Sequence, residues 1–264
     1  TLSQLPMRAP FFAPRTLADL GGPFYLADSA RQLLRADPNT GAVERVGRTN
    51  DQFTDIAFAP DGQLYGVTWA DLYEINSATG TDTWIGAHGF GDLGYLYEIN
   101  ALAFSADGQL FAAGNGLLIS INPQTGHGTA LGGLSGYRSA GDLAFAADGR
   151  LLLTTDSVTL VEAHTDGSGA TAVGSLPFND IYAAGTDPDG VIWGVRASNE
   201  IVTINPLTGA ANVVAALQAD FPLGHVWGGG FPFYLPEPPT LLLCLAGGAL
   251  VARARRSAHP ARRP

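Results

Sequence analysis

The sequence contains no lysine, one cysteine and one methionine, and only 14% of its 264 residues are charged. The single cysteine, Cys244, excludes an intramolecular disulfide, so the roughly 235 residues before the tail must be stabilised by a packed core. No charged-then-apolar leader follows Thr1. We therefore expect either that a leader was removed or that the chain is a fragment of a longer one.

The charges are unevenly distributed along the chain. All fourteen basic residues are arginine, and five of them follow Ala252, whereas all twenty-four acids precede Thr240. Residues 1–239 therefore carry a net charge of −15 and the remaining tail carries +5. A body this acidic is repelled by nucleic acid and by anionic lipid, so neither is an expected partner of the body.

The tail combines a short apolar run with a terminal arginine cluster. The run from Thr240 to Ala252 would span about 20 Å as a helix, against a hydrocarbon core of about 30 Å. Under the positive-inside rule the arginines stay cytoplasmic and the body lies outside the inner membrane. A short transmembrane helix that is later cut fits this length better than a permanent anchor. A buried core helix is the alternative.

The order of features in the tail resembles the PEP-CTERM sorting signal, which Gram-negative bacteria that produce exopolysaccharide pair with an exosortase, a membrane-embedded protease. The resemblance covers residues 235–264 and implies export, a membrane-anchored intermediate in the inner membrane, and cleavage near the Pro-Glu-Pro tripeptide. The residues implied in sorting and processing are Pro236, Glu237, Pro238, Arg253, Arg255 and Arg256.

The body is a repeat. An apolar segment followed by Asp-Gly and a second apolar segment occurs four times, with Asp-Gly at 61–62, 107–108, 148–149 and 189–190, at steps of 46, 41 and 41 residues. Asp-Gly between two short apolar runs is a hairpin signal because glycine adopts the positive φ that the turn requires. Replacing one of these glycines by valine should cost on the order of 1–2 kcal/mol.

A second turn family follows in each unit. It reads Asp37-Pro-Asn-Thr-Gly41 in the first unit and decays to His164-Thr-Asp-Gly167 in the fourth. Four strands in about 41 residues, without any helical period, predict an all-β fold, a five-bladed β-propeller of four-stranded blades followed by a short C-terminal apolar helix. The repeats resemble WD/NHL-like propeller units, which implies architecture and not activity.

The expected organisation is an N-terminal segment at 1–15, the propeller at 16–234 and the sorting tail at 235–264. Two segments compete to complete the first blade, Thr16 to Leu20 and His225 to Gly230. We favour the C-terminal segment because glycine-rich strands suit a crowded axis.

Both turn families should lie on one face of a propeller, which leaves the opposite face for binding. Aromatic, amide and charged side chains there suit sugar or peptide ligands. The long loop from Ala87 to Glu98 is the expected recognition loop, with a spacer as the alternative. The candidate ligand-binding residues are Trp69, His88, Phe90, Tyr95, Tyr97, Tyr137, Arg138, Arg196 and Trp227.

We therefore expect an exported, non-catalytic adhesion, scaffold or glycan-binding protein of the cell surface or extracellular matrix, with exopolysaccharide or matrix proteins as partners in a biofilm. The competing hypothesis is a calcium-dependent, lactonase-like hydrolase or lyase acting on a glycan or lactone. Asp55 and Asp142 occupy equivalent positions, with Asn100 close by, and a calcium ion at the channel mouth is compatible with them. Solvated or turn-capping carboxylates are the simpler reading. No residue pattern indicates a catalytic triad, a metal site or a cofactor.

Overall fold

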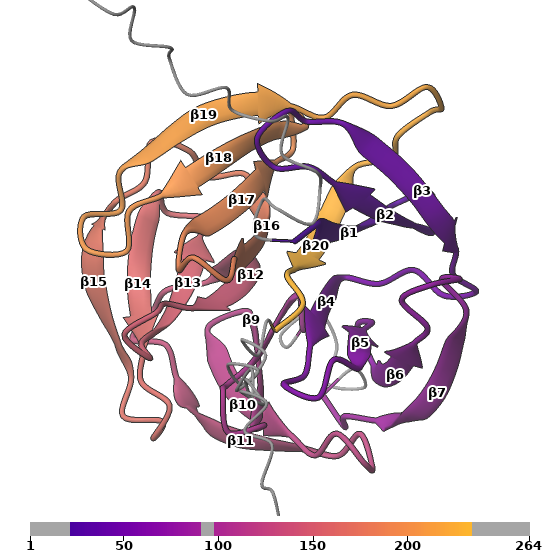
Figure 1. The fold of residues 1–264 in the computed structure, drawn as a ribbon. Coiled ribbons are helices and arrows are strands. Elements are labelled where there is room, and N and C mark those ends of the chain that lie inside the picture. The colour runs from indigo at the N-terminus through magenta and orange to yellow at the C-terminus, as the bar shows by residue number, and fades with distance from the viewer. Residues whose placement is uncertain (1–21, 91–97, 234–264) are drawn as a thin grey trace, which may run out of the picture. The chain divides into compact units, whose positions relative to one another are not determined.

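A computed structural model describes residues 22–90 and 98–233 of the chain. They form five four-stranded antiparallel sheets arranged as blades around one axis, a five-bladed β-propeller (Figure 1). All regular elements in these residues are strands, and no described helix could span a membrane. The predicted C-terminal helix, the segment 1–15 and the tail lie outside the described residues.

The innermost strand of each blade is given first. The first blade comprises β20 (Val226–Gly230), β1 (Phe24–Asp28), β2 (Gln32–Ala36) and β3 (Val43–Arg48), and the second comprises β4 (Asp55–Phe58), β5 (Leu64–Val67), β6 (Asp71–Ile75) and β7 (Asp82–Ala87). The third comprises β8 (Ala101–Phe104), β9 (Leu110–Gly114), β10 (Leu117–Ile121) and β11 (Gly128–Gly133). The fourth comprises β12 (Ser139–Phe145), β13 (Leu151–Thr155), β14 (Thr159–Ala163) and β15 (Ala170–Ser175), and the fifth comprises β16 (Ile181–Thr186), β17 (Ile192–Arg196), β18 (Glu200–Ile204) and β19 (Ala211–Ala216).

The C-terminal strand closes the ring, as the sequence favoured. β20 pairs antiparallel with β1, so the first blade takes its innermost strand from the far end of the body (Figure 1, yellow beside indigo). The ring of Phe231 stacks on Phe24 with centroids 4.5 Å apart. The competing segment Thr16 to Leu20 lies outside the described residues.

The core lies between the blades. On β4, Ile56 and Phe58 pack toward the first blade, whereas Ala57 and Ala59 pack toward the third. Successive side chains of a strand point to opposite faces, and here both faces are covered by a neighbouring blade. This burial explains why the inner strands are continuously apolar instead of alternating with polar residues.

Both predicted turn families occur as hairpins and share one end of the ring. The four Asp-Gly glycines have φ between 83° and 88°, in the left-handed region that the sequence predicted for them. In the second family, Asp37 Oδ1 accepts the Asn39 N–H at 2.9 Å, and Gly41 closes the turn at φ 77°. We call this end the turn face. The opposite end, which carries the connections between blades and the loops between second and third strands, is the loop face.

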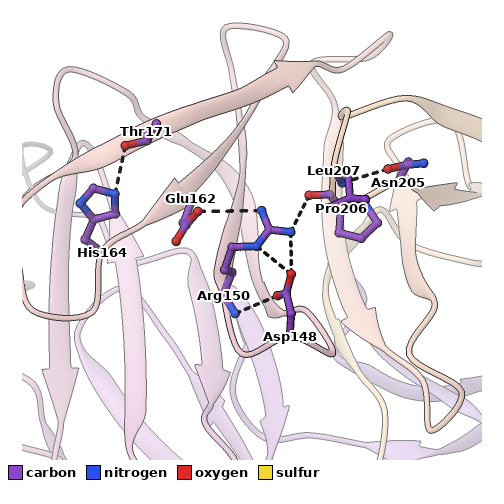
Figure 2. Close-up of polar contacts among 8 residues, drawn as sticks. All are labelled: Asp148, Arg150, Glu162, His164, Thr171, Asn205, Pro206 and Leu207. Carbon is purple, nitrogen blue, oxygen red and sulfur yellow. Dashed lines mark hydrogen bonds and ion pairs between the residues drawn. The ribbon is translucent and has the colours of Figure 1, made fainter.

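Contacts on the turn face also join neighbouring blades. Arg150, next to the Asp-Gly turn of the fourth blade, pairs with Asp148 and donates to the Pro206 carbonyl of the fifth blade at 3.1 Å (Figure 2). In the same view, Asn205 Oδ1 accepts the Leu207 N–H at 2.9 Å, and His164 contacts the Thr171 hydroxyl at 3.0 Å. The aligned turns are therefore part of the packing between blades.

Candidate functional site

The loop face brings together two of the predicted binding residues. Trp69 comes from the loop between β5 and β6, and Trp227 comes from β20 of the first blade. Their rings lie 6.3 Å apart at 54°, and Trp69 is 43% exposed. The Thr68 hydroxyl accepts the Asp71 N–H at 3.0 Å, which fixes the backbone of the loop that carries Trp69. Residues 158 positions apart thus form one aromatic surface.

His88 and Phe90 begin the long loop but serve its packing. His88 is fully buried, and its Nδ1 accepts the Phe90 N–H at 3.2 Å. Burial lowers the pKa of His88, which favours the neutral ring that this hydrogen bond requires. The half-buried Phe90 lies against Gly128 of β11. A surface ligand would not reach the His88 ring. Tyr95 and Tyr97 lie outside the described residues.

Arg196 is held in a polar cluster of the fifth blade. Its guanidinium pairs with Asp180 at 2.9 Å, pairs with Glu200, and lies 3.9 Å above the ring of Phe178. Two carboxylates and a ring already occupy this cation, so its first role is to fasten the loops around it. Tyr137 is half-buried in the core between the third and fourth blades, whereas Arg138 is exposed.

The axis holds a polar site whose role the sequence did not predict. Asp55 and Asp142 are both fully buried at equivalent positions of β4 and β12. Asp55 accepts N–H groups from Ile56 at 2.7 Å, Gly229 at 3.1 Å and Leu102 at 2.6 Å. These donors belong to the second, first and third blades.

Asp142 serves the remaining two blades. It accepts the Leu143 N–H of its own strand at 2.6 Å and the Ala184 N–H of the fifth blade. The two carboxyl groups therefore accept one hydrogen bond from each of the five inner strands, and the five donating N–H groups lie at equivalent positions. We call Asp55 and Asp142 the axial carboxyl pair. Buried backbone N–H groups need hydrogen-bond acceptors, and this pair provides them for the inner strands at the crowded centre of the ring.

Burial raises the pKa of both acids well above the usual range, and the charge of Asp55 raises that of Asp142 further. The two carboxyl groups lie close enough to influence each other's ionisation. Two carboxylates close together inside a protein cannot both ionise readily, so the pair keeps a shared proton to higher pH than either acid would alone. The simpler interpretation, that these acids are solvated or turn-capping carboxylates, is therefore wrong, because both are buried at the axis.

This arrangement bears on the calcium hypothesis. The oxygens of Asp55 and Asp142 face backbone N–H groups at the buried centre of the ring and not the channel mouth. Asn100, the third residue considered there, has a buried Oδ1 without a hydrogen-bond partner among the described residues. Within those residues no group of three or more His, Cys, Asp or Glu side chains is arranged to hold a metal ion.

Comparison with known proteins identifies the architecture alone. No family model and no curated protein matches the chain. Among solved structures, it is similar to a symmetrical protein studied for its de novo evolutionary emergence, with a TM-score of 0.57 and 18% identity, covering 80% of this chain and 98% of that one.

Two further structures are also similar. A chain from a nidogen/laminin complex gives a TM-score of 0.56 at 12% identity, covering 80% of this chain and 98% of that one. A protein of unknown function from Bacteroides thetaiotaomicron gives 0.50 at 17%, covering 77% and 62%. At these identities the likeness supports the propeller fold and carries no activity with it.

Proposed function

We propose that this chain is an exported, non-catalytic propeller that an exosortase delivers to the cell surface or extracellular matrix, where its loop face binds a glycan of the biofilm or exopolysaccharide. Two independent features support the proposal. The tail has the order of a sorting signal, with Pro-Glu-Pro, an apolar run and terminal arginines. The body presents an aromatic surface on a rigid scaffold.

The observation that carries the binding role is the convergence of Trp69 and Trp227. Indole rings bury large apolar area at little conformational cost and keep a polar N–H for orientation. The faces of sugar rings carry C–H groups that pack on such surfaces. The two rings are tilted at 54°, so they present a bent surface and not a flat one. A bent pair fits a saccharide that lies across both rings.

Substitution of the two tryptophans tests this role. Trp69→Ala and Trp227→Ala should each weaken retention of the secreted body on the producer's exopolysaccharide by about twofold to tenfold, since one aromatic contact contributes about 0.5–1.5 kcal/mol. Affinity electrophoresis measures the retention. Leu207→Ala is the control, because Leu207 is a large apolar side chain that is 70% exposed in a turn of the fifth blade, on the turn face.

If all three variants are retained equally well, the proposal that the loop face binds a glycan through these tryptophans is wrong. Thermal melting accompanies each measurement, so that loss of folding is not read as loss of binding. Tyr95 and Tyr97 remain candidates for the same ligand. Changing both to Ala should lower retention and leave the melting temperature nearly unchanged if the long loop takes part in recognition.

A further inference from the structure

The turn-face end of the axis is hollow. A cavity of about 570 Å³ opens there, lined by the second halves of all five inner strands and by the first turns of three blades. This volume falls within the range of about 300–1,000 Å³ that is usual for small-molecule sites. The cavity lies at the opposite end of the axis from Trp69 and Trp227, so it is separate from the proposed glycan surface.

Small side chains keep this cavity open. Two positions beyond the level of the axial carboxyl pair, the five inner strands carry Ala57, Ala103, Ala144, Gly185 and Gly230. Side chains two apart on a strand share a face, so these positions repeat around the ring. The inner end of the cavity is formed by the residues whose backbone N–H groups donate hydrogen bonds to the two aspartates, such as Leu102 and Ala184. The axial carboxyl pair lies one residue before this end of the cavity on β4 and β12.

The walls are apolar and the charges at the cavity are acidic. Phe58, Phe104, Phe145 and Phe231 contribute to the walls. Asp107 and Asp187 line the cavity, and none of the described residues that line it is basic. Arg150, beside the fourth-blade turn, is already engaged by Asp148 and by the Pro206 carbonyl (Figure 2). An anionic ligand would find no cation here.

From this combination we infer that the axial cavity binds a small organic cation with an apolar body, an aryl or alkyl ammonium compound. The apolar body fills the space between the alanines and phenylalanines. The ammonium group stays at the mouth near the exposed Asp107, where it remains partly hydrated. Asp187 adds negative charge there, but its oxygens already accept the Val191 N–H and the Trp193 Nε1–H. Lining carboxylates concentrate cations at such a mouth. This site is independent of the glycan role and would persist if that role failed.

Three probes that share one ring test the proposal: 2-naphthylmethyl-trimethylammonium, 2-naphthylmethanol and 2-naphthoate. Isothermal titration of the full chain at low salt should give saturable one-to-one binding of the cation, about threefold to tenfold tighter than the neutral alcohol, with 2-naphthoate weakest. The preference should shrink at high salt because the carboxylates at the mouth are screened.

Variants place the binding in the cavity. Ala103→Leu and Ala144→Leu fill it from two different blades and should abolish binding of cation and alcohol alike. Asp107→Asn should lower the affinity for the cation about twofold to threefold and leave the affinity for the alcohol unchanged, since it removes one exposed charge. Asp166→Asn is the control, because it makes the same charge change in an exposed second-family turn of the fourth blade.

If neither leucine variant folds, ¹³C-methyl alanine spectra of the wild-type chain locate the probe, and the methyl signals of Ala57, Ala103 and Ala144 should shift on titration. The proposal is overturned if the cation shows no saturable binding, if 2-naphthoate binds as tightly as the cation, or if binding survives unchanged in folded leucine variants. Unshifted alanine methyls would also overturn it.

Discussion

At the scale of single residues, two buried acids hold five strands. A carboxyl group has two oxygens and can accept several hydrogen bonds, so two of them suffice for five N–H donors. The three other inner strands carry Ala101, Ala183 and Gly228 at the same level, which leaves room for the two aspartates. A Cβ on Gly228 would lie 2.3 Å from Asp55 Oδ1, so this strand in particular requires glycine.

Removing one of these acids should destabilise the whole ring. Asp142→Ala leaves the N–H groups of Leu143 and Ala184 buried without a partner, and each such group costs about 1–3 kcal/mol. We expect a loss of about 2–6 kcal/mol in the free energy of unfolding, measured by urea denaturation. Asp189→Ala, at an exposed turn position, should stay within about 0.5 kcal/mol. Equal effects would contradict the assigned role.

The shared proton makes stability depend on pH in a defined direction. Burial raises the folded-state pKa of both acids above the unfolded value of about 3.9, so the native state binds more protons than the unfolded chain between these values. Stability is therefore fully present at low pH and falls as pH rises through the raised folded-state pKa.

Urea denaturation of the wild type at pH 5 to 8 checks this direction. Asp142→Asn removes one titrating group while keeping a polar side chain, so its slope should be shallower by up to one proton, about 1.4 kcal/mol per pH unit. Asp148 and Asp166, whose pKa values are lowered by hydrogen bonds to Arg150 and Ser168, titrate below this window. Parallel slopes for the wild type and the variant would refute the shared proton.

The sequence could place these acids but could not give their role. Their spacing from the Asp-Gly turns puts Asp55 and Asp142 at equivalent inner-strand positions. Whether such a side chain meets solvent, a cation or backbone depends on the four other strands at the axis, which lie far away in sequence. For the same reason the sequence could not distinguish the exposed Trp69 from the buried His88, and both were predicted to bind a ligand.

At the scale of strands, each outer strand is joined to the next blade by a close backbone contact. The register between the third and fourth strands shifts once in every blade, for example between Leu118 and Ile119 in the third. In the first four blades a glycine follows that shift and meets the second turn of the following blade. A Cβ on Gly132 would lie 2.1 Å from the Gly167 carbonyl oxygen.

Two adjacent glycines of β11 separate this contact from ordinary glycine effects. Gly132→Ala should cost about 1–3 kcal/mol because the fourth-blade turn must move away. At Gly133 the nearest atom to an added Cβ is 3.8 Å away, so Gly133→Ala should be neutral or stabilising by up to about 1 kcal/mol. Thermal and urea unfolding of the pair measure the difference. Similar stabilities would show that the blades are not held together at this point.

Hairpins could be predicted from sequence because their signals are local. Asp-Gly at 61–62 fixes a turn wherever it occurs between apolar runs, and Asn76 or Asp37 binds backbone within its own turn. The register shift and its glycine carry no local signal of this kind. Gly132 is required by the backbone of another blade, and the sequence alone does not show that contact.

At the scale of the whole molecule, ring closure depends on the last strand of the body. β20 lies between β1 and β4, and Asp28 helps to hold its approach by accepting the Gly224 N–H at 2.8 Å. Ser29 and His225 exchange two further hydrogen bonds at 2.8 and 3.0 Å. The ring therefore ends at Phe231, stacked on Phe24, a few residues before Pro236.

This position of closure bears on the proposed processing. If an exosortase cuts near Pro236 to Pro238, all five blades stay in the released body, because the last paired strand ends at Gly230. Glu237→Ala should trap the uncut chain in the inner membrane of the producer, whereas the wild type should be secreted with its new C-terminus near this tripeptide. Fractionation and C-terminal mass spectrometry measure both outcomes.

The released wild-type body should melt as one cooperative unit, and a body cut at Gly224 should not, since it lacks the inner strand of the first blade. Secreted protein that retains Pro264 would exclude the processing. Equal melting of the two bodies would show instead that closure by β20 is dispensable for the ring.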